Sequence, residues 1–348
     1  MDKKGDVIIS AATAGGKTEA VFLPAISSVL YSGIGSYGYS ILYISPLRAL
    51  INDQYRRLSD MLRNIPLNVT KWHGDVSVSK KISSLKAPNG VLIITPESLE
   101  SLFINHSSLV KKVFANLQYV VIDEFHFLVG EERGMQLLSL LSRLELIVGR
   151  VIPRIAMSAT FSTFDKVKWF LRNNAAVPCE IPDSGNTKHD TLISIKYYTP
   201  QDDDYPLHEI AKDLYSKLRG RNNLVFANRK YDVEKLSLYL SELSSKNHVQ
   251  NEFLAHHVKI SKEEREYVEK ELLKGQHPTT AICTTTMELG VDIGRVKSVA
   301  QIGTALSVSG VRQRLGRSGR SGEPSILRMY ASDDDGDDDF KNLHISLV

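Results

Sequence analysis

Short apolar runs rich in β-branched residues alternate with longer amphipathic stretches along most of this 348-residue chain. Apolar runs separated by helical stretches are typical of parallel strands that are joined by crossover helices. The runs lie at residues 7–10, 40–45, 90–95, 117–123, 154–158, 223–227, 251–256, 279–284, 298–302 and 325–330. The alternation therefore predicts an α/β fold with mainly parallel sheets.

The alternation is interrupted once, at residues 183–206, where Ser, Gly, Asn, Asp and Pro surround one strand-like run at residues 192–198. Such a change of composition is typical of a linker. We expect an N-terminal domain at residues 1–185, a linker region at 186–206 and a C-terminal domain at 207–348. A chain of 348 residues is long enough to bury a core in each of two domains.

Charge is unevenly distributed along the chain. Lys and Arg number 43 against 40 Asp and Glu, but six of the aspartates lie in the acidic segment 333–339. The rest of the chain is therefore moderately basic, as expected of a protein that binds a polyanion. A solvated loop is the simpler interpretation of the acidic segment, and a segment that covers a basic groove is the alternative.

Other features exclude several classes of protein. The two cysteines, Cys179 and Cys283, are too few and too far apart for a disulfide framework. No cluster of cysteines or carboxylates accompanies His126, His256 or His257, so a transition-metal site is not expected. No apolar stretch is long enough to span a membrane, and the N-terminus lacks the pattern of a signal peptide. We expect a cytoplasmic protein without a membrane partner.

A loop of small residues joins the first apolar run to the first helical stretch and ends in Lys17 and Thr18. This is a Walker A loop in its required strand-loop-helix context, in a looser form with Ala11 at the first glycine position. Lys17 can bring a positive charge to the β- and γ-phosphates, and the Thr18 hydroxyl can bind Mg²⁺. The nucleotide-binding residues expected here are Thr13, Gly15, Gly16, Lys17 and Thr18.

The apolar run at residues 117–123 ends in the acidic pair Asp123 and Glu124. A phosphate-binding loop needs a second carboxylate to hold its metal and a group to orient water. Ligands of α/β sheets bind at the carboxyl ends of strands, which is where this pair is expected. We therefore expect Asp123 to bind Mg²⁺ and Glu124 to polarise the attacking water.

Taken together in chain order, the motifs resemble those of superfamily 2 helicases of the DExH type. The matching segments are 12–18 (motif I), 45–50 (Ia), 95–99 (Ib), 123–126 (II), 158–160 (III), 225–229 (IV), 255–257 with 261–265 (IVa), 284–292 (V) and 313–320 (VI). Within the superfamily, residues 132–134, 255–257 and 288–294 resemble the large helicase-related (Lhr-like) family. The resemblance implies two tandem RecA-like domains, with ATP hydrolysed in the cleft between them.

The resemblance also implies roles for residues of motifs V and VI. Arg317 and Arg320 are expected to meet the γ-phosphate, with Arg320 the stronger candidate for the arginine finger. Gln313 is expected beside the same phosphate, and Gly290 and Asp292 are expected to approach the nucleotide. The implied cofactors are ATP and Mg²⁺.

Two further groups of residues are implied by the resemblance. Ser158, Thr160 and His126 are expected to couple the phosphate site to contacts between the domains, although a helix N-cap is the ordinary interpretation of the Ser158 triplet. The second group is expected to contact single-stranded nucleic acid, DNA rather than RNA, through phosphate and sugar. Its members are Arg48, Thr95, Asn228, Arg229 and Thr284.

The expected function is that of an ATP-dependent helicase or translocase, with 3′-to-5′ polarity by family likeness. An ATP-gated nucleic-acid clamp within a larger repair or defence complex is the alternative, whereas a small-molecule P-loop kinase would not explain motif VI. The family usually has a glutamine-containing adenine-reading element before motif I and accessory domains after motif VI. Only ten residues precede the loop, and the chain stops soon after residue 320, so we expect a fragment or a two-domain core.

Overall fold

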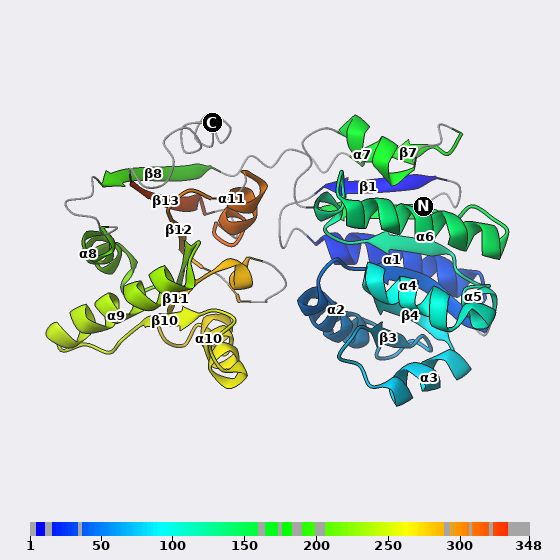
Figure 1. The fold of residues 1–348 in the computed structure, drawn as a ribbon, viewed down its shortest axis with the longest axis horizontal. Coiled ribbons are helices and arrows are strands. Elements are labelled where there is room, and N and C mark those ends of the chain that lie inside the picture. Colours follow the sequence, from blue (N-terminus) through cyan, green and yellow to red (C-terminus); the bar gives the residue numbers. More distant parts are fainter. Residues whose placement is uncertain are drawn as a thin grey trace. The chain divides into compact units, whose positions relative to one another are not determined.

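The protein divides into two compact units, Met1–Asn186 and Thr187–Val348, each with its own sheet (Figure 1). A computed structural model describes residues 5–10, 16–33, 37–158, 164–172, 176–182, 190–198, 206–288, 293–294, 296–305, 308–319 and 323–332. The acidic segment 333–339 lies outside these residues.

The first unit is built on a seven-stranded sheet in which every paired strand runs parallel to its neighbour. The strand order is β3-β4-β2-β5-β6-β1-β7, so the first strand of the chain lies between two of the last strands of the unit. The strands are β1 (Asp6–Ser10), β2 (Gly38–Ile44), β3 (Val69–Trp72), β4 (Asn89–Ile94), β5 (Tyr119–Ile122), β6 (Arg154–Ser158) and β7 (Cys179–Glu180).

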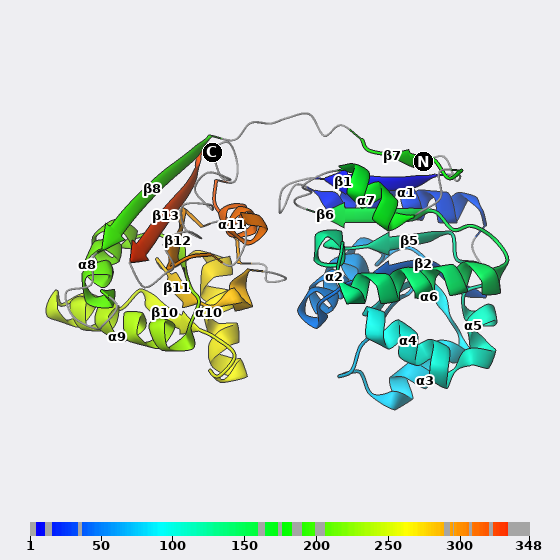
Figure 2. The same ribbon diagram turned by 45° about the horizontal axis from the view of Figure 1, so that its top comes forward.

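Helices cover both faces of this sheet (Figure 2). One hydrophobic cluster packs α1 and α2 against one face, and a second packs α3 to α7 against the other. Successive residues of β2 alternate between the clusters, because side chains of a strand point to opposite faces of a sheet. The helices are α1 (Lys17–Tyr31), α2 (Arg48–Met61), α3 (Val78–Lys86), α4 (Pro96–Asn105), α5 (Ser107–Val113), the 3-10 turn η1 (Phe125–Phe127), α6 (Glu132–Val148) and α7 (Phe164–Leu171).

The second unit has a six-stranded parallel sheet in the order β10-β11-β9-β12-β13-β8. Helices α8 and α9 pack on one face, whereas α10, α11 and the 3-10 turn η2 pack on the other. The strands are β8 (Thr191–Tyr198), β9 (Asn223–Ala227), β10 (Phe253–His256), β11 (Thr280–Cys283), β12 (Ser298–Ile302) and β13 (Ser325–Ser332). The helices are α8 (Leu207–Leu218), α9 (Lys230–Lys246), α10 (Lys262–Lys274), η2 (Thr285–Met287) and α11 (Val308–Leu315).

The two parallel sheets confirm the predicted α/β class, and every predicted apolar run contains a strand. The linker region predicted at 186–206 differs from the structure, because it contains β8, which pairs with β13 along its whole length. The strand-like run at residues 192–198 is this strand, although the Ser, Gly, Asn, Asp and Pro residues on both sides of it are typical of a linker. Residues 191–198 are therefore an edge strand of the second sheet.

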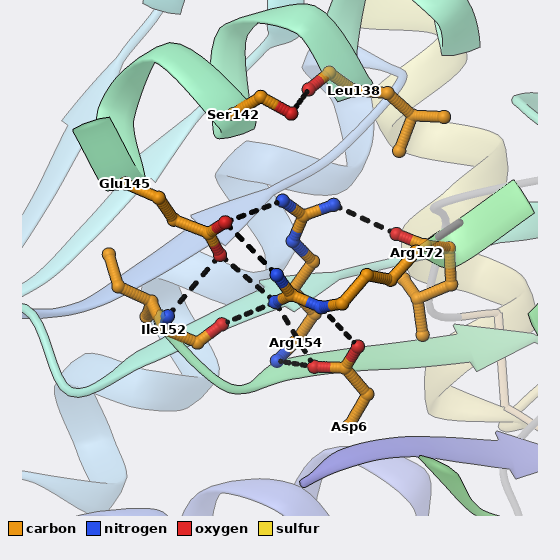
Figure 3. A network of polar contacts seen from close by, with 8 residues as sticks. Asp6, Leu138, Ser142, Glu145, Ile152, Arg154 and Arg172 are labelled. Atoms are coloured by element: carbon orange, nitrogen blue, oxygen red, sulfur yellow. Dashed lines mark hydrogen bonds and ion pairs between the residues drawn. The ribbon is translucent and has the colours of Figure 1, made fainter. Parts of the chain in front are cut away.

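Four charged side chains form a largely buried network at the amino ends of β1 and β6 (Figure 3). Arg172 donates to Asp6 Oδ2 from Nε at 2.6 Å and to Glu145 Oε1 from Nη2 at 2.9 Å. Arg154 donates to Glu145 Oε2 at 3.2 Å, and its main-chain N–H donates to Asp6 Oδ1 at 2.8 Å. Two acidic and two basic groups thereby balance one another at the edge opposite the phosphate-binding loop.

Candidate functional site

The end of the phosphate-binding loop leads directly into α1. Gly16 adopts the left-handed conformation, with φ at +72°, and Lys17 is the first residue of the helix. The Lys17 ammonium is buried and has no hydrogen-bond partner among the residues that the structure describes. The Thr18 hydroxyl donates to Gln54 Oε1 of α2 at 3.4 Å. Thr13 and Gly15 lie outside the described residues.

The acidic pair follows β5, at the carboxyl edge of the sheet. Asp123 Oδ1 accepts a hydrogen bond from the main-chain N–H of Glu124 at 2.9 Å, and Oδ2 accepts one from the Tyr43 hydroxyl. Burial raises the pKa of the Asp123 carboxyl, whereas the Tyr43 hydroxyl and the Lys17 charge act in the opposite direction. Lys17 and Asp123 of the predicted phosphate site therefore interact electrostatically within the first unit.

Glu124 has an unusual backbone conformation. Its φ of 43° and ψ of 47° lie in the left-handed region, which costs a residue with a side chain about 1–2 kcal/mol. Strained conformations of this kind concentrate at functional sites. The conformation turns the chain sharply between β5 and η1 and leaves the Glu124 side chain nearly buried beside Asp123.

His126 links the segment after β5 to the end of β6. Its Nδ1 lies 2.6 Å from the Ser158 hydroxyl and 3.4 Å from Glu124 Oε2. Burial and then the Lys17 charge lower the pKa of the His126 ring from 6.5 to about 4, so the ring is neutral at pH 7. Ser158 is thus paired within its own unit, and Thr160 lies outside the described residues.

The sequence predicts that Asp123 and Thr18 hold a metal ion, and both side chains offer oxygen atoms in this unit. Across the described ranges, no group of three or more His, Cys, Asp or Glu side chains converges on one point. Mg²⁺ does not need such a group, because it commonly uses one or two protein oxygens and completes its shell with water and phosphate oxygens.

The nucleic-acid residues predicted in the first unit are at the carboxyl edge of the same sheet. Arg48 begins α2, and its guanidinium lies against Gly74 and 3.3 Å from Asp75 Oδ1. Thr95 caps α4, since its hydroxyl accepts from the Ser98 main-chain N–H at 3.2 Å. Arg48 is therefore exposed and available to a ligand, whereas the Thr95 hydroxyl already serves as an N-cap.

In the second unit, the predicted nucleic-acid residues follow β9 and β11. Asn228 donates from Nδ2 to the Thr304 carbonyl at 2.6 Å. Arg229 donates from Nε to Asp232 Oδ2 at 2.9 Å, while most of its side chain remains exposed. Thr284 precedes η2, at the carboxyl end of β11. The three residues share the carboxyl edge of this sheet, because β9 and β11 are neighbouring parallel strands.

The predicted γ-phosphate residues of the second unit begin with Gln313 and Arg317, which are both buried at α11 and the turn after it. Arg317 donates from Nη2 to the main-chain carbonyl of Glu288 at 2.9 Å. The neighbouring Arg314 donates from Nε and Nη2 to the Glu288 carboxylate at 3.1 and 2.8 Å. The remaining predicted residues, Gly290, Asp292 and Arg320, lie outside the described residues.

Three supporting residues were not assigned a role from the sequence. Glu288 binds Arg314 of α11 and Arg317 of the turn after it. Arg133 of α6 donates to the Pro46 carbonyl at 2.9 Å and to Glu97 at 2.8 Å, which joins two predicted nucleic-acid loops. A Cβ at Gly134 would lie 1.8 Å from the Leu128 carbonyl oxygen, so this position requires glycine. Residues 132–134 resemble the Lhr-like family in sequence, but no local pattern indicates these contacts.

Two parallel α/β units, the first with a phosphate-binding loop and an acidic strand end, define a P-loop NTPase with tandem RecA-like domains. A DEAD/DEAH box helicase family model matches residues 1–167, and a helicase conserved C-terminal domain model matches residues 207–322. The chain belongs to the superfamily 2 DEAD/DEAH-box helicases.

The similarity extends to characterised relatives. The chain is 34% identical over 336 residues to the ATP-dependent helicase Lhr-Core of Methanocaldococcus jannaschii, covering 90% of this chain but only 38% of that protein. It is similar to the structure of Mycobacterium smegmatis helicase Lhr bound to ssDNA and AMP-PNP, with 27% identity, a TM-score of 0.76 and coverage of 94% of this chain and 44% of that one. Mss116p bound to ssRNA and AMP-PNP shares the fold, with 20% identity, a TM-score of 0.75 and coverage of 96% and 67%.

No helix in the described part of the chain combines the length and the apolar composition that a membrane crossing requires.

Proposed function

We propose that this chain hydrolyses ATP and uses the reaction to move along single-stranded nucleic acid. The observation that carries the proposal is the buried Lys17 ammonium, which has no hydrogen-bond partner among the described residues. A buried charge without partners is costly, and the phosphates of a nucleotide would supply both the opposite charge and the missing acceptors. The family relationship supports ATP as that nucleotide.

We propose that Mg²⁺ is held by Asp123 and Thr18. Both side chains offer oxygen atoms. Burial raises the pKa of Asp123 because it disfavours the charged carboxylate, and a bound cation would stabilise that charge. When bound, the ion would neutralise charge on the β- and γ-phosphates. Tyr43 keeps the Asp123 carboxylate oriented through its hydroxyl.

We propose that Glu124 orients the attacking water and accepts its proton. The side chain is nearly buried, directly after the metal-binding position, and its strained backbone fixes its direction. Arg317 and Arg320 of the second unit would stabilise the charge that develops on the transferred phosphate. Gln313, Gly290 and Asp292 are the other residues of that unit proposed to approach the nucleotide.

The proposed substrate is single-stranded DNA, contacted in a sequence-independent way. Arg48 and Arg229 are exposed guanidinium groups at the carboxyl edges of their sheets, which suits phosphate contacts. Thr95, Asn228 and Thr284 complete the proposed interface. DNA is favoured because the Lhr structure with 27% identity is described as bound to ssDNA, and 3′-to-5′ polarity follows only from the family resemblance. We also propose a cytoplasmic location, which the free thiols of Cys179 and Cys283 support.

The test is ATP turnover by the wild type and by Glu124→Gln. Each is measured without nucleic acid, with single-stranded DNA, with duplex DNA and with single-stranded RNA, at two salt concentrations. We expect single-stranded DNA to stimulate the wild type, and Glu124→Gln to keep ATP binding while turnover falls roughly 10²- to 10⁴-fold. Glu132→Gln removes an exposed carboxylate of the same unit and serves as the matched control.

Each alternative outcome has a specific meaning. Turnover that ignores every nucleic acid contradicts the motor function. ATP-dependent binding of DNA without turnover supports the clamp instead. Equal losses in Glu124→Gln and Glu132→Gln overturn the role of Glu124.

A further inference from the structure

His256 is a buried histidine whose two ring nitrogens face different elements. It is the last residue of β10, with 2% of its side chain exposed. Its Nδ1 lies 2.9 Å from the hydroxyl of Thr286 in η2, and its Nε2 lies 3.2 Å from Glu269 Oε1 of α10. The ring therefore connects α10 to η2.

Two groups hold the His256 residue in place. The Thr286 hydroxyl donates to the main-chain carbonyl of His256 at 3.1 Å and lies 2.9 Å from the ring Nδ1. The Glu269 carboxylate lies 3.2 Å from the other ring nitrogen, Nε2. Both ring nitrogens therefore have a polar partner.

The adjacent His257 is arranged differently. Its Nδ1 accepts from the main-chain N–H of Lys259 at 3.3 Å, and its Nε2 lies 3.3 Å from Glu234 of α9. One accepting and one donating nitrogen make this ring neutral, and burial lowers the pKa of His257. His257 is as buried as His256 but has no hydrogen bond to η2, so it is a suitable control for His256.

The turn that His256 holds carries functional positions at both ends. Thr284, a proposed nucleic-acid contact, immediately precedes η2. Glu288, which follows η2, binds the guanidinium of Arg314 through its carboxylate and that of Arg317 through its carbonyl. A shift of η2 would therefore move a nucleic-acid contact and an arginine proposed to act on the γ-phosphate.

We propose that His256 is a positioning residue for ATP turnover, which acts by fixing η2 through Thr286 while Glu269 holds the ring in place. The inference rests on the proposed function, because the residues at the two ends of η2 are given their roles there. His256 itself touches neither ATP nor nucleic acid. Its effect is expected in the rate of turnover and not in the binding of ATP, because Arg317 is proposed to stabilise charge that develops during the reaction.

Two conservative variants separate the two halves of the link. In His256→Asn, the amide occupies the place of Nδ1 and can still bind Thr286, whereas in His256→Gln it occupies the place of Nε2 and can bind only Glu269. We expect kcat of DNA-stimulated turnover to fall roughly tenfold in His256→Gln, the equivalent of one lost hydrogen bond, and much less in His256→Asn. The KM for ATP should stay unchanged in both, and His257→Gln should retain wild-type kcat.

Thermal unfolding of the same variants distinguishes positioning from a general loss of stability. A structural role predicts equal losses of kcat in the two His256 variants, or losses that follow their unfolding temperatures, and either result overturns the proposal. A selective loss in His256→Gln at matched unfolding temperature supports it.

A readout that needs no activity is nitrogen NMR of histidine-labelled wild-type protein at pH 7. We expect the His256 Nδ1 signal to shift in Thr286→Val, which removes the hydroxyl, and the His257 ring signals to stay in place. The signals are assigned by their loss in His256→Asn and His257→Gln. A His256 Nδ1 signal that is unchanged in Thr286→Val overturns the proposed link. If the wild type shows no stimulated turnover, the proposed function fails, and the NMR result still decides whether His256 is linked as described.

Discussion

The carboxylate of Glu288 accepts two hydrogen bonds from Arg314, at 3.1 Å from Nε and 2.8 Å from Nη2. Both side chains are largely buried, and Arg314 also donates to Gln301 and lies over the Phe226 ring. The pair therefore connects the turn after β11 to α11 in the interior of the second unit. Its contribution is geometric, because a buried ion pair adds little net stability compared with apolar residues of similar volume.

Replacing one member of this pair should be far more harmful than replacing both. Glu288→Leu or Arg314→Met leaves an unpaired buried charge and should lower the free energy of unfolding by about 3–5 kcal/mol, whereas the double variant should recover most of that loss. Chemical denaturation of the three variants checks this. Losses that simply add in the double variant would show that the two side chains do not act as a pair.

Protonation of His126 should destabilise the protein as the pH falls. Burial and the Lys17 charge lower the pKa of His126 from 6.5 to about 4. Between these values the unfolded chain binds more protons than the folded protein, so stability is full above pH 6.5 and is lost as the pH falls towards 4. Between pH 7 and pH 5, the wild type should lose about 2 kcal/mol more than His126→Asn, which keeps an amide near Ser158.

Denaturant unfolding at the two pH values measures this difference. The control is His106→Asn, which should follow the wild type. The His106 ring contacts the Trp72 ring and has no ionic partner in the phosphate site. Parallel curves for the wild type and His126→Asn would contradict the low pKa of the His126 ring.

Gly134→Ala should destabilise the first unit, although alanine is the better helix former. The added Cβ would lie 1.8 Å from the Leu128 carbonyl oxygen, so the backbone before α6 must move, at a cost of about 3 kcal/mol. Ser139→Ala, at an exposed position of the same helix, should instead be neutral or slightly stabilising. Thermal unfolding of both variants gives the comparison, and a stabilised Gly134→Ala would refute the close contact.

Arg172→Gln should destabilise the first unit, because it breaks the buried charge network at the start of β1. It leaves Asp6 and Glu145 without their shared cation and should lower the free energy of unfolding by about 3–5 kcal/mol. Arg63→Gln breaks an exposed pair with Asp60 and should cost less than about 1 kcal/mol. Urea unfolding measures both changes. Equal losses in the free energy of unfolding would mean that the buried Arg172 contacts contribute no more than an exposed ion pair.

Periodicity was sufficient for the central strands of both sheets, because strands buried on both faces are continuously apolar. It was not sufficient for β3 and β7, which are short edge strands of four and two residues and resemble loops in composition. The strand-like run that forms β8 was recognised in the sequence, but it was placed in the linker region and not in the second sheet. It is an edge strand with mostly exposed side chains, so the linker-like residues on both sides of it decided the assignment.

The candidate site was predictable where chemistry is local to one motif. Lys17, Thr18, Asp123 and Glu124 each follow a strand or begin a helix within a recognisable stretch, and these positions stay predictions of function. Contacts between motifs were not predictable. The bonds from Arg317 to Glu288 and from His256 to Thr286 join residues 29 and 30 positions apart. The first pair is brought together by the packing of α11 on the sheet, and the second by the pairing of β10 with β11.

The position of β1 between β6 and β7 has a consequence for how this protein is made. Residues 6–10 leave the ribosome long before their strand partners at residues 154–158 and 179–180. Asp6 likewise waits for Arg172, which is 166 residues further along the chain. The segment that carries the phosphate-binding loop must therefore remain unpaired through most of the synthesis of its unit and is inserted into the sheet near the end.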